Sequence, residues 1–107
     1  MSKIRHERLG SSDPFLVQIF DGDTDLAISI NGSSVRSANA TNPETGTVVD
    51  FVNVTEEDGA NGIFKLTRAT GTFTEAGVYD ILITYTDNAG DVQKYPREEG
   101  ALKVKFS

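Results

Sequence analysis

The sequence predicts an all-β domain, an antiparallel β-sandwich of about seven strands. Turn-forming pairs recur at short intervals, at Asp21-Gly22, Asn31-Gly32, Asp58-Gly59 and Asn61-Gly62, and such spacing is typical of a sandwich or a barrel. The runs between the turns alternate apolar with polar residues or are rich in β-branched residues, and none has helical periodicity. The length of 107 residues suits a single domain.

The turns divide the chain into its elements. We expect strands over residues 15–20, 48–54 and 62–66, and a last strand over residues 102–106. The last strand alternates apolar residues with Lys103 and Lys105, which is typical of an edge strand with its charges outward. Residues 33–47 are rich in Ser, Asn, Thr and Ala. They are compatible with a mobile connection, or with a strand at Val35 followed by a loop.

The strongest strand pattern covers residues 78–86. Its apolar and aromatic face holds Tyr79, Ile81, Ile83 and Tyr85. The other face is mostly polar, as in a half-buried antiparallel strand. Asp87-Asn88-Ala89-Gly90 then predicts a hairpin, residues 92–95 return, and Pro96 ends the pairing because proline has no N–H to donate. The core that these strands predict contains Phe15, Val17, Ile19, Phe51, Phe64, Leu66, Tyr79, Ile81, Ile83 and Tyr85.

The segment from Phe73 to Ile81 resembles the E–F corner of immunoglobulin-like domains. In that corner a glycine allows a tight turn, and a tyrosine two residues later folds back to hydrogen-bond an upstream backbone group. Gly77 and Tyr79 match these two positions, and Ile81 stands where an antibody domain has its second cysteine. The resemblance therefore implies an immunoglobulin-like sandwich in which Tyr79 makes the corner.

A second resemblance covers residues 15–106. Leu16 to Gly22, the Gly-x-Phe-x-Leu run from Gly62, Ala76 to Asp80 and the pair Tyr95-Pro96 resemble the N-terminal sandwich domain of phage upper-baseplate proteins, and small phage structural proteins of that type. Upper-baseplate proteins continue after this domain into a stalk, whereas the present sequence stops at Ser107. The function of the stalk is therefore not carried over. The resemblance implies a second strand over residues 26–35. It also implies a virion component that is docked on other phage structural proteins, in several copies or as a homo-oligomer.

The N-terminal segment differs in charge from the rest of the chain. Residues 1–12 carry a net charge of +2 from Lys3, Arg5, Arg8 and Glu7, whereas the remainder carries −8. We expect a flexible basic arm over residues 1–13, in front of an immunoglobulin-like domain over residues 14–107. Either the arm contacts a partner through its three basic residues, or it is a frayed terminus with no role. If the arm contacts a partner, deletion of residues 1–12 is expected to leave the melting temperature of the domain nearly unchanged and to weaken assembly or virion attachment.

The composition excludes several function classes. The net charge of −6 argues against nucleic acid as a partner. The sequence has no apolar run that predicts a membrane helix or a secretory signal. The resemblance implies that the protein is located in the virion, after synthesis in the host cytoplasm. There is no cysteine, and the single histidine, His6, lies in the polar arm. No catalytic set of residues is recognisable, so we expect neither an enzyme nor a cofactor.

Two further sites follow from residue types. Asp21, Asp23 and Asp25 alternate along a turn and are weak candidates for calcium ligands, although an acidic turn explains them better. The alternative function is a carbohydrate-binding or adhesion module of immunoglobulin-like type. In that module Tyr85, Tyr95 and Phe73 would stack on sugars, although the alternating pattern places Tyr85 in the core.

Overall fold

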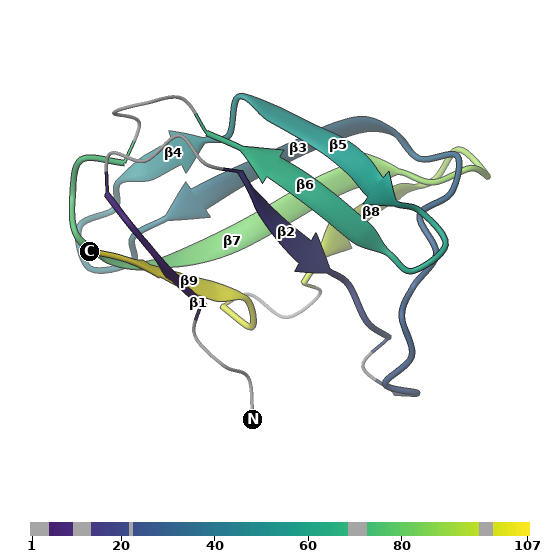
Figure 1. Cartoon of the computed structure of the whole chain (residues 1–107), viewed down its shortest axis with the longest axis horizontal. Helices are drawn as coiled ribbons and strands as arrows, with labels where there is room; N and C mark the ends of the chain where they lie inside the picture. Colours follow the sequence, from purple (N-terminus) through teal and green to yellow (C-terminus); the bar gives the residue numbers. More distant parts are fainter. Residues whose placement is uncertain (1–4, 10–13, 22, 69–72, 97–99) are drawn as a thin grey trace.

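The computed structural model describes residues 5–9, 14–21, 23–68, 73–96 and 100–107, with only the backbone of Arg5. Two β-sheets pack face to face in it (Figure 1), and the described residues contain no helix. The predicted all-β sandwich is therefore confirmed. The strands are β1 (Arg5–Glu7), β2 (Phe15–Gln18), β3 (Ser34–Thr41), β4 (Val48–Asp50), β5 (Asn53–Asp58), β6 (Ile63–Thr67), β7 (Gly77–Thr86), β8 (Val92–Tyr95) and β9 (Lys103–Phe106).

The larger sheet has the order β1-β9-β7-β3-β4, and β8 also pairs with β7. The smaller sheet has the order β2-β6-β5. Strand β7 is the centre of the larger sheet, because its second half pairs with β8 and its first half with β9. The return from β7 is thus divided at Pro96, where the pairing of β8 ends as expected. The described strands outnumber the predicted seven because β1 was not expected as a strand and because the expected strand over residues 48–54 is divided into β4 and β5.

The core lies between the sheets and contains all ten residues that the sequence predicted. Phe73 and Phe106 complete it. Their rings stack with centroids 3.9 Å apart, and the Tyr79 ring meets both edge-on at 5.4 Å. Such edge and offset contacts stabilise aromatic clusters beyond the burial of their area. The aromatic cluster joins β7 and β9 to the segment that precedes β7.

Strand β3 differs from the sequence-based expectation. The expected strand over residues 26–35 is reduced to a bridge between Phe20 and Ala27, and pairing with β7 begins only at Ser34. The core face of β3 consists of Ala38 and Ala40, which are buried opposite β7. Alanine has a low strand propensity, so the pairing with β7 determines this strand, and local sequence does not.

The N-terminal segment also differs from the expected flexible arm. Strand β1 lies beside β9 (Figure 1) and pairs with it in parallel. His6 is opposite Lys105 in this pair. The backbone pairing continues past β1, because the Leu9 N–H donates to the Ser107 carbonyl at 3.0 Å. The sequence suggested that β9 is an edge strand. In the structure β9 lies between β1 and β7, so it is not the edge of its sheet. The short stretch of residues 5–9 is ordered by contacts with the C-terminal strand that local composition does not reveal.

Candidate functional site

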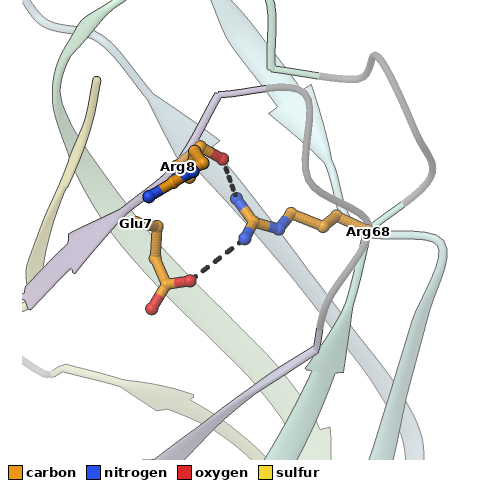
Figure 2. Close-up of polar contacts among 3 residues, drawn as sticks. All are labelled: Glu7, Arg8 and Arg68. Atoms are coloured by element: carbon orange, nitrogen blue, oxygen red, sulfur yellow. Dashed lines mark hydrogen bonds and ion pairs between the residues drawn. The ribbon is translucent and has the colours of Figure 1, made fainter.

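A buried arginine connects the N-terminal segment to the sandwich. Arg68 directly follows β6, and only 2% of its surface is exposed. Its Nη2 donates to Oε1 of Glu7 at 3.0 Å, and its Nη1 donates to the carbonyl of Arg8 at 3.2 Å (Figure 2). A buried charge is costly without such partners. The ion pair therefore holds the end of β1 against the body of the domain.

Two aromatic rings surround the guanidinium group. The Arg68 Cζ lies 5.3 Å from the ring centroid of Phe106 and 5.8 Å from that of Phe15. These distances are within the range of cation–π attraction, which is strongest where water is excluded. Phe106 lies on β9 and Phe15 on β2, so Arg68 contacts both sheets as well as the N-terminal segment.

Arg68 was not among the residues expected to form a site. A usable signal was present, because Phe64, Leu66 and Arg68 follow one another with period two along and just beyond β6. Phe64 and Leu66 are core residues, so the same alternation directs Arg68 inward. An arginine on the core face of a strand requires an acidic partner, and Glu7 is the one acid among residues 1–12.

The three basic residues predicted to contact a partner are not equivalent in the structure. Arg8 is exposed, and its backbone carbonyl is the atom that binds Arg68 (Figure 2). Arg5 lies on β1, where only its backbone is described, and Lys3 lies outside the described residues. Their contact with a partner stays a prediction.

The residues of the predicted corner have the geometry expected of them. The Tyr79 hydroxyl donates to the backbone carbonyl of Glu75 at 2.9 Å. A side chain at Gly77 would place its Cβ 2.8 Å from Nδ2 of the buried Asn42, at a φ of +152°, so glycine is required there. Burial and the Glu75 carboxylate raise the pKa of the Tyr79 hydroxyl. Ile81 is buried next to this corner.

An open groove lies between the loop that follows β2 and the β7–β8 hairpin. Its volume is about 590 Å³, and Phe20, Tyr85 and Tyr95 contribute aromatic surface to it. Tyr85 and Tyr95 were sugar-binding candidates, whereas the third candidate, Phe73, is buried against Phe106. Tyr85 is only 5% exposed, so the accessible rings are the half-buried Tyr95 and Phe20, which is 41% exposed. Phe20 was expected only as part of a strand.

The acidic residues at this groove are engaged in their own turns. Oδ1 of Asp21 accepts the N–H of Asp23 at 2.8 Å and of Thr24 at 3.3 Å. The Asp25 N–H donates to the Asp21 carbonyl, and Asp25 has a φ of 60°. Among the described residues no cluster of three or more His, Cys, Asp or Glu side chains could hold a metal ion. The structure therefore gives Asp21, Asp23 and Asp25 the geometry of an acidic turn.

The predicted β7–β8 hairpin is present. Oδ1 of Asp87 accepts the N–H groups of Ala89 and Asp91 at 3.0 and 2.9 Å, and Oδ2 accepts Nε2 of Gln93 at 3.0 Å. The hydrogen bond from Asp91 and that from Gln93 are the main causes that lower the pKa of Asp87. Asp87 therefore fixes the hairpin that forms one wall of the groove.

Comparisons with known proteins give no family assignment. The chain matches no family model, and it matches no curated protein sequence.

His6 is exposed on β1. Among the described residues no helix is long and apolar enough to cross a membrane.

Proposed function

We propose that the chain is a non-enzymatic, immunoglobulin-like structural module of a phage virion, which docks in several copies on other virion proteins. The observation that carries the immunoglobulin-like identification is the Tyr79–Glu75 hydrogen bond, which is the defining contact of a tyrosine corner. Sheet order supports it. The order β2-β6-β5 corresponds to strands B-E-D, and β9-β7-β3-β4 corresponds to strands G-F-C-C′.

The virion part of the proposal rests on the resemblance to small phage structural domains. Exposed apolar side chains support a docking role, because such side chains gather where proteins bind one another. The loop after β2 exposes Leu26 at 68%, and β8 exposes Val92 at 65%. Val92 and Ser34 both pair with Thr86, so Val35, which is 81% exposed, lies at the same end of the larger sheet.

Quantitative mass spectrometry of gradient-purified particles tests this proposal. Particles of the phage that encodes the chain should contain it in several copies, at a constant ratio to an established structural protein. A chain that is abundant in the infected cell but missing from the purified particles would contradict the proposal.

The alternative, a carbohydrate-binding module, is favoured by the groove. Tyr95 and Phe20 provide partly exposed rings, and Asn88, Gln93 and Lys94 provide hydrogen-bonding groups around them. Sugar sites combine these two kinds of group. On a glycan array, reproducible binding that is lost in Tyr95→Ala would favour this function. Val48→Ala, an exposed position on β4, is the matched control and should bind as the wild type does.

A further inference from the structure

The groove between the loop that follows β2 and the β7–β8 hairpin carries negative charge as well as aromatic surface. Its described lining residues include the carboxylates of Asp21, Asp23 and Asp87 and a single cation, Lys94. Lys94 directly precedes Tyr95 on β8. Neighbouring side chains of a strand point to opposite faces, so the charge of Lys94 is directed away from the Tyr95 ring. The groove therefore has an excess of negative charge next to an aromatic ring.

Two of the three carboxylates are placed to pair with a ligand. Oδ1 of Asp21 accepts the N–H groups of its turn, from Asp23 at 2.8 Å and from Thr24 at 3.3 Å, and Asp23 itself is exposed. In Asp87, by contrast, both carboxylate oxygens accept hydrogen bonds within the β7–β8 hairpin. Asp21 and Asp23 can therefore contact a ligand directly, whereas Asp87 adds its charge to the groove.

The rings of the groove favour a guanidinium group as the partner of these carboxylates. Phe20 is 41% exposed and Tyr95 is half-buried. A guanidinium group stacks on aromatic faces, pairs with carboxylates and is more weakly hydrated than an ammonium group. The fold already contains this combination, because the Arg68 guanidinium lies 5.3 Å from the ring centroid of Phe106 and pairs with Glu7 at 3.0 Å. A neutral sugar would use the rings of the groove but not its charge.

We infer that the groove receives an arginine side chain of the virion protein on which this chain docks. The inference rests on the proposed function and names one contact by which the docking occurs. Exposed apolar side chains beside the groove favour a protein over a small molecule. The carbonyl of Leu26, a residue that is 68% exposed, accepts the Asp21 N–H, and Val92, 65% exposed, precedes Gln93 of the groove. Arginine is enriched among interface anchors, which fill pockets surrounded by contacts that exclude water.

An NMR titration tests the groove without the partner protein. The ligand is arginine blocked at both ends, and the control ligand is blocked citrulline, which has nearly the same shape but no charge. Blocked arginine should shift the amide signals of Asp23, Gln93 and Tyr95, and blocked citrulline should bind several-fold more weakly. Asp23→Asn and Tyr95→Ala should each weaken the binding of blocked arginine several-fold. Glu57→Gln and Val48→Ala, at exposed positions on β5 and β4, are the matched controls and should leave it unchanged.

Three results of this titration would overturn the inference. The first is equal binding of the two ligands, or no shift of the groove signals up to the solubility of blocked arginine. The second is wild-type affinity in Asp23→Asn, a variant that folds because Asp23 is exposed in a surface turn. The third is a neutral glycan that binds the groove equally well in the wild type and in Asp23→Asn, because the groove would then be a sugar site.

Particles of a phage from which the gene is deleted separate this inference from the proposed function. Purified wild-type chain should bind to these particles, and Asp23→Asn should bind several-fold less. Because charge pairs are screened by salt, this difference should decrease as the salt concentration rises. Equal binding of the two chains would overturn the inference and leave the proposed function in place. Wild-type particles that lack the chain would contradict the proposed function, whatever the result with blocked arginine.

Discussion

Removal of the Glu7 charge should destabilise the fold although Glu7 lies near the chain terminus. Glu7→Gln keeps the shape of the side chain and one acceptor oxygen but removes the charge that faces Arg68 at 3.0 Å. Hydrogen bonds to charged groups contribute about 1.5–3 kcal/mol. Full loss of a partner from a buried ion pair costs about 3–5 kcal/mol. Because the Arg8 carbonyl still accepts from Arg68, the lower range of about 1.5–3 kcal/mol is expected.

Urea denaturation followed by circular dichroism measures this loss. For an m-value of about 1–3 kcal/mol/M, the midpoint should fall by about 1 M. Glu57→Gln removes the same charge from an exposed position on β5 and should change stability by less than about 0.5 kcal/mol. Addition of Arg68→Met to Glu7→Gln should restore much of the loss, because an apolar side chain of similar length leaves no buried charge. Equal midpoints for the Glu7 and Glu57 variants would refute the anchoring of β1 by Arg68.

Four other outcomes follow. Tyr79→Phe should lower the free energy of unfolding by about 1 kcal/mol, because the Glu75 carbonyl loses its hydrogen-bond donor, whereas Tyr95→Phe should lower it much less. Equal urea midpoints for these two variants would contradict the tyrosine corner. Ile81→Ala should cost about 2–5 kcal/mol in the same assay, and an unchanged midpoint would mean that the faces of β7 are reversed. The raised pKa of Tyr79 keeps its hydroxyl neutral in the folded state above its ordinary value of 10.0. The stability that the neutral Tyr79 hydroxyl contributes is therefore complete below that ordinary pKa and is lost as the pH rises towards the pKa of the folded state. Between these two pKa values the urea midpoint of the wild type should fall with pH more steeply than that of Tyr79→Phe. The lowered pKa of Asp87 has the opposite effect. The stability that the ionised carboxylate contributes is present above its ordinary pKa of 3.8 and is lost as the pH falls through the pKa of the folded state. The urea midpoint of Asp87→Asn should not show this loss.

Strand β7 and its corner could be predicted because their information is local. The alternation from Tyr79 to Tyr85 is unbroken, and the glycine and tyrosine of the corner are two residues apart. A single segment of sequence therefore specifies the strand, its buried face and the turn before it.

The N-terminal strand could not be predicted in the same way. Glu7 and Arg68 are 61 residues apart, and an ion pair leaves no periodic pattern in either segment. Residues 1–13 are polar and contain few apolar side chains, a composition typical of a flexible arm. Pairing with β9 and with a buried guanidinium reverses that expectation for residues 5–9. The groove itself was not predicted: of the residues that line it, Tyr85 and Tyr95 were candidates for sugar stacking, while Phe20 was assigned only to a strand.

Cryo-electron microscopy of particles with and without the chain tests the central claim most directly. Particles of the encoding phage should show repeated density of a small two-sheet sandwich on the surface of another virion protein. That density should disappear when the gene is deleted. Identical maps from the two kinds of particle would contradict a structural role in the virion.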